Sequence, residues 1–239
     1  MPTSVYPEVA LKKGREEALL RGHPWMFSGA IASVSGNPGA GDIVTVCDAT
    51  GNPLALAFYN PRTDIALRIL TRECRENISA YFWQARLHAA FKLRGKIIGE
   101  QTNAYRLINA EGDGFPGLIV DVYNQTLVMS VSTAGMEKQK NHVLNALIAQ
   151  LKPLRVYENS NGASRRQEGL ESRQAFVFGE ESAEPVAIVE NGLRFDVDVI
   201  SGQKTGFFLD QRVNREKLGD LSRDAMVLNC FSYTGAFSV

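Results

Sequence analysis

Short apolar runs separated by turn residues fill the first third of the chain, and this pattern is typical of β-strands. The runs cover residues 9–12, 43–47, 54–59 and 65–70. Pro24 fixes its own φ and disfavours helical angles at His23, so residues 21–31 are predicted to form a shaped connector. Several short strands at such close spacing predict a compact barrel or sandwich.

From residue 77 onward, apolar residues recur three or four positions apart, which indicates amphipathic helices. One helix is predicted over 78–92, with Asn77 or Ser79 as its N-cap, and a second over 136–151. Further strands are predicted at 105–109, 118–123, 126–132 and 155–158. The polar, glycine-bearing stretch 159–173 is predicted to be a mobile loop.

The last part of the chain begins with a hairpin signal, Asn191-Gly192, between alternating runs at 186–190 and 193–199. A helix is predicted over 209–218. The apolar run 225–228 then predicts a buried strand, and a polar, aromatic loop containing Gly235 follows it. Such a loop at the carboxyl end of a parallel strand is a common ligand site in open α/β sheets.

These patterns predict a multidomain chain of mixed α+β and α/β class, and its 239 residues exceed the usual single domain. We expect a β-barrel domain over 1–74, a central α/β domain ending in the hairpin over 75–200, and the beginning of a third domain with an open α/β sheet over 201–239. No internal repeat or low-complexity tract interrupts this order.

The charge balance and the cysteine content exclude few classes of protein. The 26 Lys and Arg residues balance the 26 Asp and Glu residues, so overall charge gives no support to a nucleic-acid binder and does not exclude one. The three cysteines, Cys47, Cys74 and Cys230, are odd in number and widely spaced, which favours neither a disulfide framework nor a zinc site. Without a signal pattern or a membrane-spanning apolar run, a cytoplasmic location is expected.

Two stretches, 203–212 and 231–237, lack a simple structural explanation. Their aromatic side chains could stack on a flat ring, and backbone N–H groups near Gly235 could meet an anionic group. The alternative is that Phe207 and Phe208 are core residues beside a domain joint, with Asp210 and Arg212 in solvent. Spacing alone favours neither alternative.

The motifs QKTGFFLDQR at 203–212 and NCFSYTGAF at 229–237 resemble those of S-adenosylmethionine-dependent methyltransferases that modify cytidine in 23S ribosomal RNA. The large-subunit rRNA methyltransferase I type is the most similar. The glycine-dense turn EGDGFPGLIVD at 111–121 also recurs in that group, and RGHPWMFSGAI at 21–31 resembles its N-terminal PUA domain, a small RNA-binding β-barrel.

The resemblance implies that the domain beginning at residue 201 is a Rossmann-like methyltransferase domain. It also implies S-adenosylmethionine as cofactor, 23S ribosomal RNA as partner, and methylation of cytidine at C5 by the full-length protein. The two motif loops are then expected to contact the cofactor. The positions carried over are Thr205, Phe207, Asp210, Arg212, Phe231, Ser232, Tyr233, Thr234, Gly235 and Phe237.

The chain departs from the family pattern in lacking the acidic residue that would bind the ribose hydroxyls and the motif that holds a nucleophilic cysteine. The resemblance implies that this cysteine attacks C6 of cytosine and makes C5 nucleophilic, which requires the thiolate. We therefore expect the nucleophile beyond residue 239 and no turnover by this chain alone, which would be an incomplete N-terminal part. Cys230 is expected to be a small core residue at the end of a buried strand, not a catalyst.

A basic cluster near the N-terminus predicts RNA contacts through Lys13, Arg15, Arg21 and His23. Glu16 and Glu17 interrupt this cluster, so a plain solvated surface is the alternative. Trp25 could stack on a base, but an anchor in the barrel core is the favoured explanation, with His23 bonding the connector backbone. The three histidines lie far apart in the sequence, and no metal site is proposed.

A second hypothesis is a non-catalytic RNA-binding module in which the C-terminal motif is a remnant. A methyltransferase that acts on another base or another RNA is a third, because target choice depends on RNA shape and on residues outside these motifs. The sequence leaves open whether the protein forms a homodimer.

Overall fold

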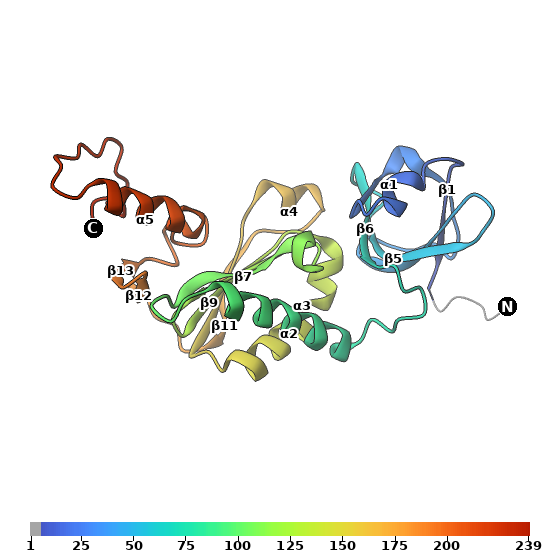
Figure 1. Cartoon of the computed structure of the whole chain (residues 1–239). Coiled ribbons are helices and arrows are strands. Elements are labelled where there is room, and N and C mark those ends of the chain that lie inside the picture. The colour runs from blue at the N-terminus through green and yellow to red at the C-terminus, as the bar shows by residue number, and fades with distance from the viewer. Residues whose placement is uncertain (1–5) are drawn as a thin grey trace.

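A computed structural model describes residues 6–239, so residues 1–5 of the expected first domain lie outside the described part of the chain. The chain runs from an N-terminal β-rich unit, through a central sheet with two long helices, to a C-terminal hairpin and helix (Figure 1). The described residues contain a six-stranded, a five-stranded and a two-stranded sheet.

The N-terminal sheet has the strand order β2-β6-β5-β4-β1-β3 and curves around its own apolar core. All its neighbouring strands are antiparallel except β1 and β4, which are parallel. Its elements are β1 (Glu8–Leu11), α1 (Glu17–Leu20), β2 (Trp25–Phe27), the 3-10 turn η1 (Ser28–Ala30), β3 (Ile31–Val34), β4 (Asp42–Cys47), β5 (Pro53–Tyr59) and β6 (Ile65–Thr71).

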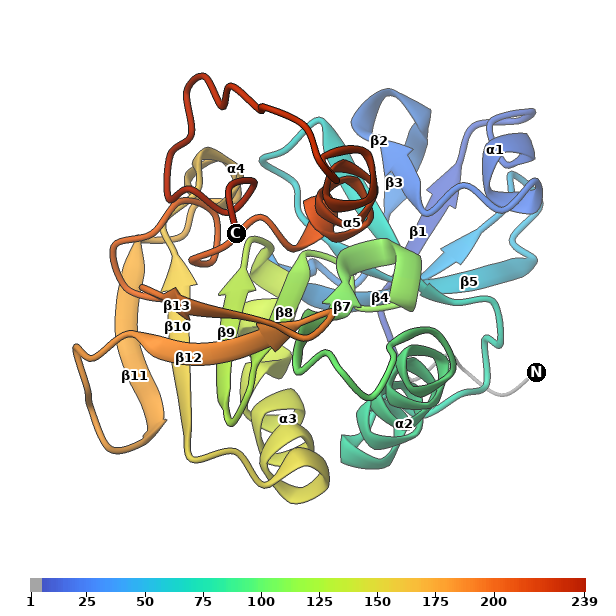
Figure 2. The same ribbon diagram turned by 60° about the vertical axis from the view of Figure 1, so that its left-hand side comes forward.

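The central sheet has the order β11-β10-β9-β8-β7 and carries α2 and α3 on one face (Figures 1 and 2). The connection from β9 to β10 runs through α3, and these two strands are parallel because the chain crosses over before it returns to the sheet. The elements are α2 (Ala80–Ile97), β7 (Ala104–Asn109), η2 (Ala110–Asp113), β8 (Leu118–Tyr123), β9 (Thr126–Val131), α3 (Ala134–Leu151), β10 (Arg155–Ser160), α4 (Ala163–Gln167) and β11 (Arg173–Gly179).

Aromatic packing fixes α2 on this sheet. Trp83 is fully buried, and its ring lies 4.9 Å from that of Phe82 and 5.5 Å from that of Phe115, between centroids. Ser79 occupies the N-cap position of α2 without a side-chain hydrogen bond. At the start of α3, Thr133 accepts a hydrogen bond from the Met136 N–H and so satisfies one of the free donors of a helix N-terminus.

The other face of the central sheet is covered by the hairpin β12 (Val186–Glu190) and β13 (Leu193–Val197), which crosses it in Figure 2. A separate apolar cluster joins the two layers, including Tyr123, Tyr157, Ile188 and Phe207. The 3-10 turn η3 (Leu209–Gln211) and α5 (Arg212–Leu221) follow the hairpin. The hairpin therefore holds the segment that contains the first motif against the sheet.

The prediction of a mobile loop over 159–173 is wrong. Strand β10 extends to Ser160, α4 follows, and the chain returns at Arg173 as β11, an unpredicted strand that pairs antiparallel with β10. The polar residues of this stretch make specific contacts: Arg165 is buried and donates to the Val131 carbonyl at 3.0 Å. Most residues of this stretch are exposed, as their polarity suggests, but the buried Arg165 and Glu168 are paired inside the protein and fix its position.

The buried strand predicted at 225–228 is also absent from the structure of residues 6–239, and Met226 and Leu228 are exposed. A strand requires a neighbouring strand to satisfy its backbone groups, and no described strand pairs with this run. Cys230, predicted as a core residue at the end of that strand, is consequently exposed. The predicted helix 209–218 is displaced towards the C-terminus, with a 3-10 turn in place of its first residues.

Candidate functional site

The first motif begins in a tight turn after β13 that only glycine can form at two positions. A Cβ on Gly202 would lie 2.3 Å from the Asp198 carbonyl oxygen, and Gly206 has a φ of +126°. The Asp198 carboxylate accepts hydrogen bonds from the N–H groups of Ile200 and Ser201 at 2.9 and 2.8 Å. Backbone packing therefore directs Thr205 towards the central sheet.

Thr205 anchors the turn to β8. Its hydroxyl is buried, donates to Asp121 Oδ2 at 2.6 Å and lies 2.9 Å from the Tyr123 hydroxyl. Asp121 is fully buried, and Arg106 of β7 donates hydrogen bonds to its two carboxylate oxygens at 2.8 and 2.9 Å. The first motif is thus fixed by side chains that lie more than 80 positions earlier in the chain.

Burial, together with the charge of Asp121, raises the pKa of Tyr123 well above its ordinary value, so this phenol stays neutral. The hydrogen bonds to Asp121 raise the pKa of Arg106, which keeps its charge. The cluster therefore pairs one carboxylate with one guanidinium and surrounds them with two hydroxyl groups. It acts as a structural anchor beneath the motif.

A second buried pair holds the other side of the same motif. Arg215 of α5 donates to both carboxylate oxygens of Glu190 at 2.6 and 2.8 Å, and both residues are buried. Arg215 also bonds the Phe208 carbonyl at 3.0 Å, and its guanidinium lies 4.5 Å from the ring centroid of Phe207. The Phe207 ring packs on Phe195 of β13, at 5.2 Å between centroids.

The second motif touches the first mainly through Tyr233. The Tyr233 hydroxyl accepts a hydrogen bond from the Gln203 N–H at 2.9 Å, and its ring meets Phe208 edge to face at 5.9 Å. Phe237 adds a longer contact, with the Arg215 guanidinium 5.8 Å from its ring centroid. The two stretches singled out by the sequence are therefore neighbours in space.

The remaining positions of the second motif face outward. Phe231 is fully exposed, and the side chains of Ser232 and Thr234 are also exposed. Phe231 and Tyr233 have positive φ values of +59° and +51°, and Gly235 has +76°. The Gly235 N–H donates to the Ser232 carbonyl at 2.8 Å, so this segment is a compact turn with its polar groups towards solvent.

A cleft of about 250 Å³ lies between the first motif and β7, and its lining combines apolar and aromatic residues with the cations Arg94, Arg106, Lys204 and Arg212. Arg94, Arg106 and Lys204 each contact a carboxylate, at Asp113, Asp121 and Asp210. The hydrogen bond from Lys204 holds the pKa of Asp210 below its ordinary value. Arg212 also lines the cleft, and its guanidinium has no ion-pair or hydrogen-bond partner among residues 6–239.

The positions predicted to bind a cofactor fall into two groups. The side chains of Thr205 and Phe207 are buried and engaged by other protein groups. The accessible or partly accessible ones are Asp210, Arg212, Phe231, Ser232, Tyr233, Thr234, Gly235 and Phe237. They offer a carboxylate, hydroxyl groups, a guanidinium and aromatic rings, which suits the ribose, the carboxylate and the adenine of S-adenosylmethionine.

Asp121 lies in the turn motif at 111–121, but its role in positioning the first motif was not predicted. Sequence reasoning missed the other residues that position this motif, namely Tyr123, Glu190 and Arg215. Each lies in or beside a strand or helix with no local sign of a functional role. Only their contacts across the sheet and the hairpin identify them.

The predicted RNA-binding residues lie in the N-terminal unit around a hollow of about 520 Å³ beside α1 and β2. Arg15, Arg21 and His23 line this hollow, whereas Lys13 is exposed outside its lining. Arg21 pairs with Glu17 one helical turn away at 3.2 Å. His23 Nδ1 accepts from the Trp25 N–H at 3.1 Å, which confirms the role predicted for His23 in the connector backbone.

Trp25 does not anchor the barrel core, so that prediction is wrong. It is half-buried, and its indole N–H donates to Glu111 Oε1 at 2.9 Å across the boundary with the central sheet. Arg68 bonds the same Glu111 oxygen at 2.9 Å and pairs with Glu168 at 3.3 Å. Asn60 donates to Glu168 Oε2 at 2.6 Å, so two carboxylates of the central unit hold the N-terminal unit in place.

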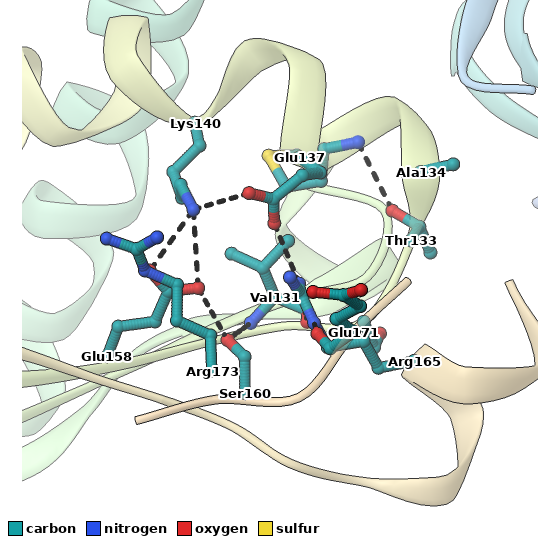
Figure 3. Close-up of polar contacts among 12 residues, drawn as sticks. Val131, Thr133, Ala134, Glu137, Lys140, Glu158, Ser160, Arg165, Glu171 and Arg173 are labelled. Carbon is teal, nitrogen blue, oxygen red and sulfur yellow. Dashed lines mark hydrogen bonds and ion pairs between the residues drawn. The ribbon is translucent and has the colours of Figure 1, made fainter. Parts of the chain in front are cut away.

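A buried ionic network stabilises the segment that was expected to be mobile (Figure 3). Glu158 is fully buried and accepts from Lys140 at 3.1 Å, from Arg173 at 3.0 Å and from Ser160 at 2.9 Å. Arg165 pairs with Glu137 at 2.7 Å. Burial opposes the charge of Glu137, but hydrogen bonds from Lys140 and Arg165 leave its pKa below the ordinary value. The network ties α4 and β11 to α3.

Other kinds of site receive no support from the described residues. Within 6–239 no group of three or more His, Cys, Asp and Glu residues is placed to hold a metal ion. The cysteines Cys47, Cys74 and Cys230 are all free, and burial raises the pKa of Cys47 to about 11. No helix in this part of the chain combines the length and apolar character needed to span a membrane.

Comparison with known proteins identifies two families in the chain. Residues 9–72 match a PUA-like domain family, and residues 119–239 match the family of S-adenosylmethionine-dependent methyltransferases. The chain is 42% identical over 240 residues to ribosomal RNA large subunit methyltransferase I of Pseudoalteromonas translucida, covering 100% of this chain and 60% of that protein. The same enzyme of Photobacterium profundum is 42% identical over 241 residues, with the same coverage of 100% and 60%.

Solved structures support the same grouping. A candidate S-adenosylmethionine-dependent methyltransferase from Streptococcus mutans superposes with a TM-score of 0.79 at 25% identity, over 97% of this chain and 59% of that one. A candidate methyltransferase solved in complex with SAH gives a TM-score of 0.80 at 25% identity, over 97% and 58%. The chain thus spans about 60% of the length of the curated relatives it matches.

These matches confirm the predicted fold class, a PUA-like β domain followed by a Rossmann-like methyltransferase fold. They also confirm S-adenosylmethionine as the cofactor of the family that residues 119–239 match. The domain boundaries and the individual cofactor and RNA contacts stay predictions.

Proposed function

The chain belongs to the S-adenosylmethionine-dependent methyltransferases, and from this premise we propose that the whole protein methylates C5 of a cytidine in 23S ribosomal RNA. The relatives are named for methylation of large-subunit ribosomal RNA. Cytidine, the C5 position and the 23S molecule rest on the resemblance of the motifs at 203–212 and 229–237.

The observation that carries the proposal is the contact between these two motifs. They are separated in sequence, yet Tyr233 joins them through the Gln203 N–H and the Phe208 ring. The contact lies next to the cleft that Asp210 and Arg212 line. A cofactor with an aromatic base, hydroxyl groups and a charged end would meet matching groups there.

When bound, S-adenosylmethionine would supply an electrophilic methyl group. We propose that exposed aromatic rings of the second motif stack on its adenine, and that Asp210 accepts hydrogen bonds from hydroxyl or ammonium donors. Thr205 and Phe207 would be positioning residues: their buried contacts with the sheet and the hairpin hold the first motif at a fixed distance from the sheet. The nucleophilic cysteine implied by the resemblance is not among the residues placed at this site.

The N-terminal unit would supply RNA binding through the hollow beside α1, where Arg15, Arg21 and His23 are exposed. The joint formed by Glu111 and Glu168 would keep that hollow in a constant position relative to the C-terminal motifs. A bound RNA would then reach the methyl donor at a defined distance from its anchoring point.

The test is calorimetric titration of S-adenosylmethionine into this chain and into a chain extended to the length of its relatives, followed by transfer of labelled methyl groups to unmodified 23S ribosomal RNA. We expect binding and transfer by the longer chain, with the label at cytidine C5. Label on another base would correct the target and leave the cofactor site in place. Absence of both binding and transfer would favour a non-catalytic RNA-binding module.

The second motif allows a sharper test within the longer chain. Gly235 has a φ of +76° and open space around its Cα, so a Val side chain there strains the turn without a clash. We expect Gly235→Val to abolish measurable cofactor binding while the N-terminal units stay folded. Gly51→Val is a matched control, because Gly51 has a φ of +88° with open space in a turn of the other unit. Unchanged cofactor affinity in Gly235→Val would contradict the assignment of this loop.

A further inference from the structure

A second hollow of about 470 Å³ lies between the N-terminal unit and α4, and it is lined by residues of both. Residues 62–65, in the turn before β6 and its first position, form one wall, and Ser164, Gln167 and Glu168 form the other. The hollow does not involve either C-terminal motif. Its size is in the range of small-ligand sites, about 300–1,000 Å³.

Phe27, the last residue of β2, lines both this hollow and the one beside α1. Its side chain is 53% exposed, and its ring makes no aromatic or cation–π contact within the described part of the chain. The neighbouring Trp25 differs, since Glu111 binds its indole N–H and the Arg68 guanidinium lies 5.5 Å from its ring centroid. Phe27 is therefore a free aromatic face at the junction of two hollows.

The second hollow offers polar and cationic groups that other residues do not use. Arg62 is exposed, and its guanidinium has no ion-pair or hydrogen-bond partner in residues 6–239. It points towards the end of α4, because a Cβ on Gly169 would lie 3.6 Å from Arg62 Nη1. Ser164 and Gln167 are exposed on α4, and their side chains likewise make no hydrogen bond to a described residue.

Most carboxylates around the two hollows are already paired. Glu168 bonds Arg68 and Asn60, and Glu17 pairs with Arg21. Asp64 is the remaining acidic side chain of the lining, against the unpaired guanidinium groups of Arg15 and Arg62. The free charge therefore favours an anionic group in the hollow beside α1, where Arg15 is unpaired. In the hollow beside α4, Arg62 offers an unpaired guanidinium next to the carboxylate of Asp64.

We propose that Phe27 is a stacking platform for an unpaired nucleotide of the RNA, and that Arg15 and Arg62 contact the phosphates on its two sides. Single-stranded RNA is recognised by this combination of an aromatic face with flanking cations. The proposal rests on the proposed function only in taking RNA as the ligand. The Glu168 contacts to Arg68 and Asn60 hold the two walls together, so the site is formed before the RNA arrives.

The proposed site lies between the hollow beside α1 and the C-terminal motifs. In Figure 1, α4 lies between α1 and α5 along the same side of the molecule. A strand that leaves the hollow beside α1, crosses Phe27 and passes α4 is directed towards the C-terminal motifs. The platform would therefore set which nucleotide, counted from the anchored one, reaches the methyl donor.

The test measures binding of the 239-residue chain to a fluorescein-labelled single-stranded RNA of about 12 nucleotides, within the site sizes of single-strand binders. Phe27→Ala should weaken binding about tenfold, and Phe27→Trp should restore it. Tyr81→Ala is the matched control, because Tyr81 is 77% exposed on α2 and lines neither hollow. Thermal unfolding of Phe27→Ala should match the unsubstituted chain.

A second readout separates phosphate contact from a merely structural role. Arg62→Gln should lower the magnitude of the slope of log affinity against log salt concentration by about one. Arg194→Gln, at an exposed position of β13, should leave this slope unchanged. Equal affinities of Phe27→Ala and the unsubstituted chain would overturn the proposal, as would an equal loss in Tyr81→Ala. Failure of the unsubstituted chain to bind this RNA would also overturn it. Methyl transfer by the longer chain remains a separate test of the proposed function.

Discussion

The two C-terminal motifs belong to one family pattern, but the protein holds them in different ways. The first, 203–212, has a buried Thr205 bonded to Asp121 and a buried Phe207 packed on the hairpin. The second, 231–237, is mostly exposed and is attached mainly by Tyr233. The difference indicates that the sheet and the hairpin determine the position of one motif, while few buried contacts within residues 6–239 hold the other.

The two motifs are expected to differ in whether they are ordered before the cofactor binds. A segment held by buried polar groups keeps its geometry without a ligand, since leaving those groups unpaired is costly. A segment with few buried contacts is expected to open at low free-energy cost. We therefore expect the first motif to be ready for the cofactor and the second to become ordered when the cofactor binds.

The largest effect is expected from the buried ion pair that supports the first motif. Glu190→Ala would leave Arg215 buried without its carboxylate, and removal of one partner of such a pair costs about 3–5 kcal/mol. Urea unfolding of the hairpin and α5 measures this loss. The matched control is Lys204→Met, which breaks the largely exposed pair with Asp210 and should cost at most about 1 kcal/mol. Similar losses in the two variants would contradict the distinction.

A smaller effect is expected from two identical substitutions, one in each motif. Thr205→Val keeps the shape but removes a hydroxyl from the buried Asp121 carboxylate, at a cost of about 1.5–3 kcal/mol. Thr234→Val changes an exposed side chain, and its effect should stay within about 0.5 kcal/mol. Denaturant midpoints of the two variants compare the motifs directly. If Thr234→Val were the more damaging, the second motif would be the better anchored one.

The smallest effect is expected from acid. The hydrogen bond from Lys204 lowers the pKa of Asp210 below its ordinary value of 3.8. A carboxyl with a lower pKa in the folded state adds stability above its unfolded pKa and loses it as the pH falls through its folded pKa. Because this pair is largely exposed, the contribution should be below about 1 kcal/mol.

The measurement for this pair is the stability difference between the unsubstituted chain and Asp210→Asn. We expect the difference to be present at neutral pH and to vanish in strong acid. A difference that grows as the pH falls would show that the carboxyl is stabilised in its neutral form instead.

Local periodicity was sufficient to predict most of the regular elements. The run predicted at 54–59 is strand Pro53–Tyr59, and the helix predicted over 136–151 is Ala134–Leu151. The hairpin signal is confirmed by its geometry, since Asn191 and Gly192 both have the positive φ that such a turn requires, +49° and +83°. Each of these features depends on residues only a few positions apart.

The wrong predictions concern elements whose environment lies far away in the sequence. The run 225–228 is apolar, yet no described strand pairs with it. Conversely, the polar, glycine-bearing stretch 159–173 was predicted to be a mobile loop, but Arg165 and Arg173 pair with Glu137 and Glu158 and hold it in place. The composition of a segment indicates which residues could be buried. Whether the segment forms a strand or an ion pair depends on partner residues elsewhere in the chain.

The candidate site shows the same limit. The two motifs themselves could be identified from sequence, because their glycines and aromatic residues stand out locally. Two groups that fix the first motif, Asp121 and Tyr123 of β8, lie 84 and 82 positions away from Thr205, so the sequence around Thr205 does not indicate these contacts. The sharing of Phe27 by two hollows depends equally on how α4 meets the N-terminal unit.

Hydrogen exchange of a chain extended to the length of its relatives, with and without S-adenosylmethionine, tests the central claim most directly. The amides of residues 203–212 should be protected in both samples, and those of 231–237 should gain protection only when the cofactor is present. Exchange in 231–237 that is unaffected by the cofactor would contradict the assignment of this loop, and rapid exchange in 203–212 would contradict its preorganisation.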